Sequence, residues 1–296
     1  PADHGHRADQ RTDELPILRP APALEGIAVA HLTARAGQAL LEAADFDLGA
    51  VQRQINETTQ PSSQLLSLSF NGHLPMNRTQ STLYNCIGRL SSAGTQTESP
   101  PIILGAHYDG LGLGAFGSFH TEGPAFHPGA DDNASGIAAL LEVARQMNGT
   151  EKTRRRDVYF VALAGEEIGL RGSRRMAHLW VEKGIEKPGV YINMDMIGRL
   201  RSGRIHVAAP DEELAMREAM TRAARKARLA VDFEPLYSRH SDHLPFAEAG
   251  FSALSITTGR HGDYHMPSDT IDRIEWSGIT RLTGLVTTLL EDLADQ

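Results

Sequence analysis

The chain has 296 residues, of which 41% are hydrophobic and 22% charged, and its formal net charge is −8 at pH 7. This size fits one large domain, or one domain with a small extension. The acidic balance argues against a nucleic-acid partner, which requires a basic face, and no apolar run reaches the roughly 18 residues of a membrane span.

The first part of the chain carries weaker patterns than the rest. Residues 1–24 are polar, contain prolines and have no periodicity, so we expect a disordered or surface-draped lead. Residues 25–80 are predicted to form an N-terminal extension. In it we expect a strand over 27–32, a helix that starts after Thr33, and a second short helix or a turn over 47–55.

Two more strands are expected before residue 100, over 65–71 and 82–90, with Asn71 and Gly72 as a turn between them. From Pro101 onward, short apolar strands alternate with amphipathic helices. Strands that are apolar throughout and alternate with helices predict a largely parallel sheet covered on both faces. The predicted strands are 102–106, 158–164, 190–194, 204–208 and 251–257, and the predicted helices are 134–147, 173–183, 212–228 and 277–293. The sequence therefore predicts an α/β fold with three layers, α/β/α, around a mostly parallel central sheet.

Four of these strands end in groups that bind divalent cations. His107 follows the first strand, the pair Glu166 and Glu167 the second, Asp195 the third, and the run 263–265 (Asp-Tyr-His) the last. The start of the first long helix adds Asp131 and Asp132. Because the carboxyl ends of neighbouring parallel strands converge on one crevice, we expect these side chains to meet.

So many carboxylates in one crevice repel each other unless cations neutralise them. The single cysteine, Cys86, excludes a thiolate metal cluster, so the ligands must be His, Asp or Glu. Two histidines and three carboxylates, one of them shared, suit two zinc ions about 3.5–4 Å apart. The carboxylate left over, one of the adjacent glutamates, indicates a proton carrier and hence metal-assisted hydrolysis. Each signal alone is weak, since Asp-Asp commonly caps a helix and Glu-Glu is usually surface.

One motif invites a different interpretation. Gly112, Gly114 and Gly117 match G-x-G-x-x-G after a strand, as in dinucleotide-binding proteins. That fingerprint requires a helix to begin at the glycines, and the prolines and glycine between residues 118 and 128 predict none. We interpret the segment as a flexible rim loop, with His120 and His127 as pocket wall or bystanders.

The motifs together resemble the co-catalytic di-zinc aminopeptidases, the group of aminopeptidase Y, bacterial leucyl aminopeptidase and glutamate carboxypeptidase. The resemblance covers roughly residues 80–296, and residues 81–296 would be a single catalytic domain with a mixed eight-stranded sheet. The matching segments are HYD (107–109), GADDNASG (129–136), AGEE with GLRGS (164–173), NMDMIG (193–198), SDHLPF (241–246) and DYHMPSDT (263–270).

The resemblance also implies a role for each matching residue. Asp132 would bridge two zinc ions per chain, with His107 and Asp195 completing one site and Glu167 and His265 the other.

The remaining roles implied by the resemblance concern chemistry next to the ions. Glu166 would be the general base, Asp109 would hold the imidazole of His107 in its ligating tautomer, and Tyr264 would stabilise the oxyanion. Asp131 receives no ligand role, and Asp242 and His243 are expected to shape the pocket.

The function implied is a zinc-dependent aminopeptidase that hydrolyses the N-terminal bond of a peptide substrate through a metal-bridging hydroxide. A glutamate-carboxypeptidase-like enzyme stays open as an alternative, with Arg239 and Arg260 as a cationic pocket for the substrate carboxylate. A glutaminyl cyclase-like acyltransferase would use one zinc ion, and a receptor-like relative would have lost ligands; the complete ligand set argues against both.

The resemblance also bears on the extension and on location. The segment 27–56 is similar to the tail of a protease-associated lid domain, so residues 25–80 would be a remnant of such a lid or, as the alternative, a helical extension that packs on the catalytic domain. The start at Pro1 without methionine or signal peptide indicates a processed or cut chain. Because relatives are often exported, we expect a secreted or periplasmic protein without membrane partners.

Overall fold

The computed structural model describes residues 34–66, 80–92, 99–114, 116–149, 154–182, 189–238 and 240–295. The strand expected over 27–32, most of the strand expected over 65–71, and Arg239 lie outside these ranges. The chain divides into two compact units, residues 1–80 and 81–296, and each is described by itself.

In the first unit, the described residues form two helices, α1 (Ala34–Ala43) and α2 (Leu48–Thr58). Helix α2 begins where the sequence predicts, because the Asp47 carboxylate accepts the backbone N–H of Ala50 at 2.9 Å and so caps the first turn. None of the described residues of this unit is buried.

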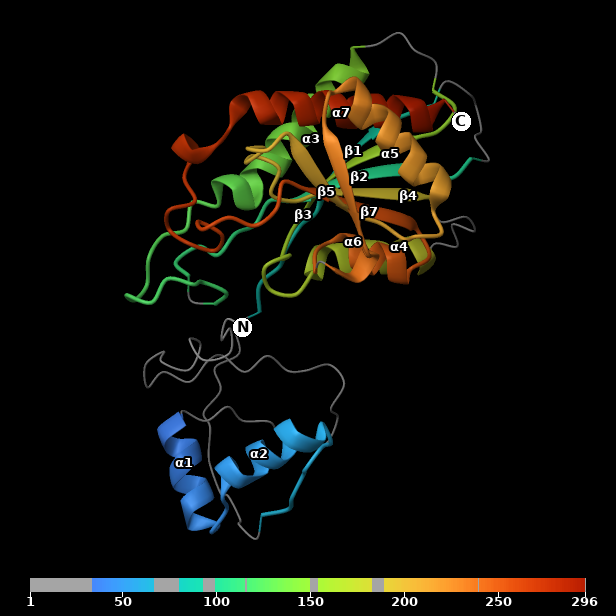
Figure 1. Ribbon diagram of the computed structural model, residues 1–296. Helices are drawn as coiled ribbons and strands as arrows, with labels where there is room; N and C mark the ends of the chain where they lie inside the picture. Colours follow the sequence, from blue (N-terminus) through green and yellow to red (C-terminus); the bar gives the residue numbers. More distant parts are fainter. Residues whose placement is uncertain are drawn as a thin grey trace. The chain divides into compact units, whose positions relative to one another are not determined.

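The second unit is built on a seven-stranded sheet with the strand order β1-β3-β2-β4-β7-β5-β6 (Figure 1). Strand β1 pairs antiparallel with β3, and β5 pairs antiparallel with β7, while the other neighbours are parallel. The strands are β1 (Cys86–Leu90), β2 (Ile102–His107), β3 (Val158–Leu163), β4 (Val190–Met194), β5 (Arg204–Ala208), β6 (Ala230–Glu234) and β7 (Ser252–Thr257).

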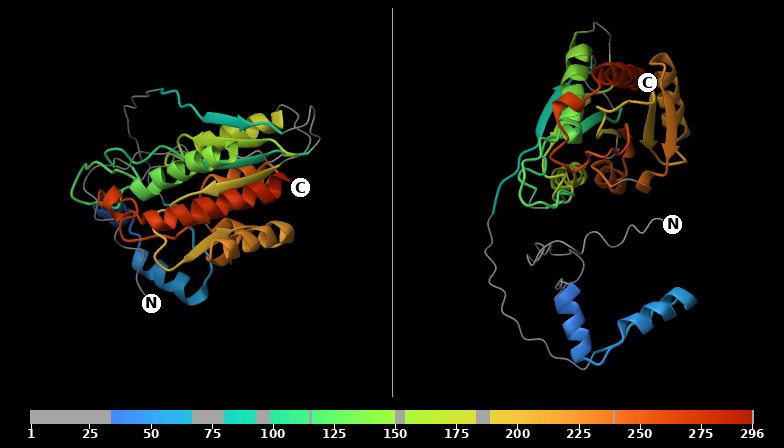
Figure 2. Two further views of the ribbon diagram at one scale, coloured as in Figure 1. Left: turned by 90° about the horizontal axis from the view of Figure 1, so that it is seen from above. Right: turned by 60° about the vertical axis from the view of Figure 1, so that its left-hand side comes forward.

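Helices cover both faces of this sheet (Figures 1 and 2). One face carries α3 (Gly136–Asn148), α5 (Leu214–Lys226) and α7 (Trp276–Ala294), and the other carries α4 (Arg171–Glu182) and α6 (His243–Glu248). Successive side chains of a strand point to opposite faces of the sheet, so one strand contributes to the hydrophobic cores on both faces. Ile102 and Leu104 of β2 pack with α3 and α7, whereas Ile103 packs with α4 and α6. The predicted three-layer fold with a mixed, mostly parallel sheet is confirmed.

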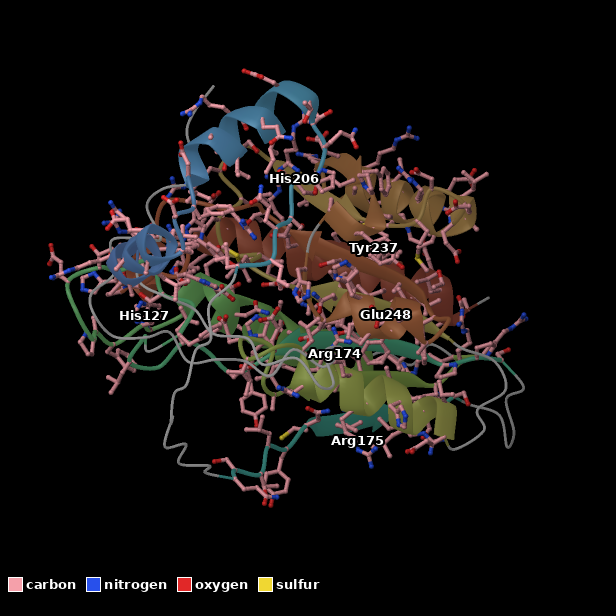
Figure 3. All side chains as sticks on the ribbon, turned by 90° about the horizontal axis from the view of Figure 1, so that it is seen from below. His127, Arg174, Arg175, His206, Tyr237 and Glu248 are labelled. Carbon is pink, nitrogen blue, oxygen red and sulfur yellow. The ribbon has the colours of Figure 1, made fainter. Side chains whose placement is uncertain are left out.

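Two elements were not predicted from the sequence, and one expected number differs. Strand β6 is short and carries Asp232 and Glu234. Charged residues are common on a strand at the sheet edge, but they interrupt the apolar pattern by which a strand is predicted from the sequence. Helix α6 contains Pro245 and only six residues; its Glu248 forms an ion pair with Arg174 of α4 at 3.5 Å (Figure 3). The resemblance implied eight strands, and the described residues form seven.

Three further helical segments connect these elements: η2 (Ala130–Ser135), η3 (Leu236–Ser238) and η4 (Ile271–Arg273). Among the described residues, no helix has the length and apolar character to cross a bilayer. Export of the protein stays a prediction.

The four parallel neighbours β3, β2, β4 and β7 position the site. Their register aligns the last residues of the strands, with His107 beside Leu163 and Met194 beside Ile256. All four carboxyl ends therefore lie along one edge of the sheet, where the polar residues that follow them converge.

Candidate metal centre

The first cluster of ligand-type side chains is formed by His107, Asp132 and Asp195. His107 is the last residue of β2 and is 1% exposed, and Asp195 directly follows β4. The Nε2 atom of His107 lies 3.2 Å from Oδ1 of Asp132 and 3.6 Å from Oδ1 of Asp195.

The second cluster contains Asp132 again, together with Glu167 and His265. The Nε2 atom of His265 lies 3.4 Å from Oδ2 of Asp132 and 3.4 Å from Oε2 of Glu167. The two carboxylate oxygens of Asp132 therefore face different histidines. One aspartate joins the two clusters.

This donor set fits zinc. Within each cluster, the three ligand atoms lie within 4.8 Å of one another, and imidazole nitrogen and carboxylate oxygen are zinc ligands. The other ring nitrogens are already engaged: Nδ1 of His107 lies 3.2 Å from the carbonyl of Asp109, and Nδ1 of His265 lies 2.8 Å from that of Gly117. Because a carbonyl only accepts, each Nδ1 carries a hydrogen, and each Nε2 faces the carboxylates, where it could offer its lone pair to a cation after losing its own proton.

The charges of these side chains are strongly coupled. Burial lowers the pKa of both histidines, but the neighbouring carboxylates outweigh it, so the pKa of His107 is well above its usual value and that of His265 rises to about 10. Burial raises the pKa of Asp132, yet the two imidazoles hold it below its usual range. A cation in either cluster would replace these protons as the neutralising charge.

Glu166 lies beside the clusters and belongs to neither of them. It lines an open cleft together with Asp132, Asp195, Tyr264 and His265. Burial raises the pKa of Glu166 to about 9, and the charges of Asp195, Asp242 and Glu167 add to the rise. Glu166 is a carboxyl group able to hold a proton near neutral pH.

Asp109 holds the loop that carries the two glutamates. Its Oδ1 accepts the backbone N–H of Glu166 at 3.1 Å and its Oδ2 accepts that of Glu167 at 3.2 Å. The carboxylate lies 3.7 Å from Nδ1 of His107, farther than the carbonyl of the same residue. The contact of Asp109 to His107 is thus made first by its backbone, and the sequence did not indicate its bonds to the glutamates.

Tyr264 forms one wall of the cleft. Its ring stacks on the imidazole of His265 with 3.8 Å between centroids, and the guanidinium of Arg260 lies 4.8 Å from the Tyr264 ring centroid. Burial raises the pKa of Tyr264, so its hydroxyl keeps its proton at neutral pH and is a hydrogen-bond donor.

Asp132 is held by residues that sequence reasoning missed. The Oδ2 atom of Asp269 accepts the backbone N–H groups of Asp131 and Asp132 at 2.9 and 3.0 Å. The Oδ1 atom of Asp269 accepts from the buried guanidinium of Arg199 at 2.9 Å. We call Asp269 and Arg199 the Asp132 clamp. The quoted motif that ends at Thr270 contains Asp269, but nothing in its spacing shows that it binds backbone groups far away in sequence.

The neighbouring acidic residues also have partners. Asp131 accepts from the N–H of Gly198 at 2.6 Å and contacts Nε2 of His261 at 2.9 Å, so it points away from the clusters. Asp242 is fully buried, its Oδ1 accepts from Ser173 at 2.5 Å, and burial raises its pKa to about 6.

The structure thus brings together all five residues expected to bind metal, with Glu166 and Tyr264 beside them. Their roles stay predictions, since geometry alone identifies no bound ion. Comparison with known proteins adds a separate line of information. Residues 85–290 match the sequence model of peptidase family M28. The chain belongs to peptidase family M28.

Individual relatives of this chain share less than a third of its residues in the aligned segments. Aminopeptidase YwaD of Bacillus subtilis is 29% identical over 179 residues, which are 57% of this chain and 38% of that protein. The structure of a zinc aminopeptidase from Bacillus subtilis, BSAP, superposes with a TM-score of 0.61 at 25% identity and covers 72% of this chain and 50% of the other. This chain therefore spans half or less of the length of these two relatives.

The same fold also occurs in a protein with a different name. A glutaminyl cyclase from an Acidobacteriales bacterium superposes with a TM-score of 0.56 at 22% identity over 71% of this chain and 73% of the other. At that identity the likeness shows the fold alone. It does not decide the reaction of this M28 chain.

Proposed function

We propose that this chain is a zinc-dependent aminopeptidase that hydrolyses the N-terminal peptide bond of a peptide. The observation that carries the proposal is the sharing of Asp132 between two clusters with Glu166 beside them and outside both. A structural zinc site has four protein ligands and needs no further acidic group, whereas a hydrolytic site keeps an open coordination position and a group that carries a proton.

Two zinc ions would be held by His107, Asp132 and Asp195 and by Asp132, Glu167 and His265. When bound, they would supply Lewis acidity towards the scissile carbonyl and the attacking water, and they would neutralise the carboxylates.

The chain's own residues would move the proton and place the substrate. Glu166 would accept the proton of the attacking water and deliver it to the leaving amine; cations nearby would lower its pKa from the raised value, so it would start as the carboxylate. The Tyr264 hydroxyl would donate to the carbonyl oxygen as negative charge develops there. Tyr264→Phe should then lower kcat at unchanged zinc content.

The test of the proposal is Glu166→Gln, assayed with leucine p-nitroanilide. We expect kcat to fall by about 10²- to 10⁴-fold, the usual contribution of a general acid–base, at unchanged zinc content. Glu182→Gln on α4, at an exposed position, is the control and should keep full activity. A Glu166→Gln protein that is loaded with zinc and fully active would refute the assigned role.

One observation favours a second candidate, a glutamate-carboxypeptidase-like enzyme. The exposed guanidinium of Arg260 lines the same cleft, where it would meet the carboxylate of a substrate. Parallel assays separate the candidates: an aminopeptidase cleaves aminoacyl p-nitroanilides, and a carboxypeptidase cleaves N-blocked peptides with a free carboxylate. Release of ammonia from N-terminal glutaminyl peptides would instead reveal a cyclase.

A further inference from the structure

The loop between β2 and η2 is organised around a buried serine–histidine pair. We call residues 110–129, described except for residue 115, the rim loop. Ser118 is 3% exposed and His127 is 6% exposed, and the Ser118 Oγ lies 2.8 Å from Nε2 of His127. Nδ1 of His127 donates to the carbonyl of Ala125 at 2.7 Å, so in the neutral imidazole the Ser118 hydroxyl donates to Nε2.

The imidazole of His127, whose position is labelled in Figure 3, is buried against Gly114, Ser118 and Ala125 of the rim loop. The backbone N–H of His127 donates to the carbonyl of Gly112 at 2.8 Å and so joins the two ends of the rim loop. Gly114 has a φ of +73°, and a Cβ there would lie only 2.4 Å from Cε1 of the His127 ring. The glycine is required both for the backbone conformation and for the space that the ring occupies.

The residues on either side of Ser118 are bonded to His265. The carbonyl of Gly117 accepts the Nδ1–H of His265 at 2.8 Å, and the N–H of Phe119 donates to the carbonyl of His265 at 3.0 Å. His265 itself has a φ of +56°, a conformation that costs a non-glycine residue energy and that surrounding bonds must hold. His127 also lines a small cavity together with Asp132, Glu167 and His265.

We propose that Ser118 and His127 are positioning residues for the Glu167–His265 cluster. Their hydrogen bond fixes the rim loop so that the Gly117 carbonyl holds the His265 ring, with Nε2 directed at Asp132 and Glu167. The other cluster has a different support, because Nδ1 of His107 faces the carbonyl of Asp109 at the end of β2. Loss of the pair should therefore weaken one of the two ion sites selectively.

The test is a calorimetric titration of chelator-treated protein with Zn²⁺. A second titration with Co²⁺ records the visible absorption of the bound ion. The wild-type chain should bind two ions. Ser118→Ala and His127→Phe should each bind one ion with wild-type affinity and the second about 10- to 100-fold more weakly, the usual effect of removing a group that orients a metal ligand. The double variant should lose no more than either single variant. Ser277→Ala and His178→Phe, at exposed positions, are matched controls and should leave both affinities unchanged.

Several results would overturn the proposal. Both ions binding as in the wild type would show that the pair orients nothing, and equal weakening of both ions would show a general effect on the fold. Failure of both single variants to fold, judged by circular dichroism, would also contradict it, because the pair would then support the fold rather than one ligand.

The proposal rests on the two-ion part of the proposed function, and the two fail in different ways. A two-ion isotherm without turnover of any aminoacyl substrate would reject the aminopeptidase and leave the positioning role to be decided by the variants. At saturating zinc, Ser118→Ala should recover kcat, and at limiting zinc it should not.

Discussion

His107 and Asp195 stand directly at the ends of two neighbouring parallel strands, whereas Glu167 and His265 stand on loops beyond the ends of theirs. The sheet itself places the backbone of the first two residues. The second two depend on hydrogen bonds from elsewhere, with Asp109 holding the N–H of Glu167 and Gly117 holding the ring of His265. If both clusters bind an ion as proposed, one ion would depend mainly on the sheet and the other on the loops around it.

The largest effect is expected from the residue common to both clusters. Asp132→Ala removes the carboxylate whose two oxygens face His107 and His265, so both ion sites should be lost and turnover with them. Zinc per chain, measured by plasma mass spectrometry after dialysis, should fall from two to none. Asp211→Asn on the exposed surface is the control. One tightly held ion remaining in Asp132→Ala would show that the clusters are independent.

The next pair of variants separates the clusters. Asp195→Ala should remove the ion site that contains His107, which we call the sheet site. Glu167→Ala should remove the ion site that contains His265, which we call the loop site. Each of these two carboxylates belongs to one cluster alone. Each variant should retain one zinc ion per chain in the same dialysis experiment. Loss of both ions, or retention of both, in either variant would contradict the assignment of one ion to each cluster.

The Asp132 clamp supports both sites at once and gives the opposite pattern to Ser118→Ala. Asp269→Asn removes the negative charge that faces Arg199 and disturbs the N–H bonds that hold Asp132. We expect both zinc affinities to fall by about 10-fold or more, as for other groups that orient metal ligands. Calorimetric titration measures this, with Asp292→Asn on α7 as the matched control. Weakening of only one ion would contradict the clamp's shared role.

The last prediction concerns the dependence of zinc affinity on pH, which leaves every side chain in place. The pKa of His107 is well above its usual value and that of His265 is about 10, so both imidazoles carry a proton at neutral pH. Zinc requires the neutral form, so binding releases these protons, and affinity rises with pH by about tenfold per unit for each proton released. Calorimetry at pH 7 in buffers of different ionisation enthalpy counts the protons. No proton release would mean that the histidines are neutral or unbound.

The sequence was sufficient for the parts of the site that follow the sheet. His107 and Asp195 end apolar strands, and this placement alone predicts that they converge. The bridging role of Asp132 was implied by family resemblance rather than by its spacing. The segment Ala130–Ser135 forms η2, where the sequence showed only a helix start.

The loop site could not be predicted to the same depth. The carbonyl of Gly117 leaves no trace in the sequence because every residue has one, and Asp269 accepts from backbone groups 137 and 138 residues away from its own position. Strand β6 was missed because acidic residues at a sheet edge carry no apolar pattern. Contacts made through the backbone become visible only in the folded chain.

In the proposed metal centre, two metal ions would share Asp132. A crystal grown with zinc, with diffraction recorded at the zinc absorption edge, tests it directly. We predict two anomalous peaks about 3.5–4 Å apart, one beside His107 and Asp195 and one beside Glu167 and His265, with Asp132 contacting both. A single peak, no peak, or two peaks of which only one contacts Asp132 would contradict the account.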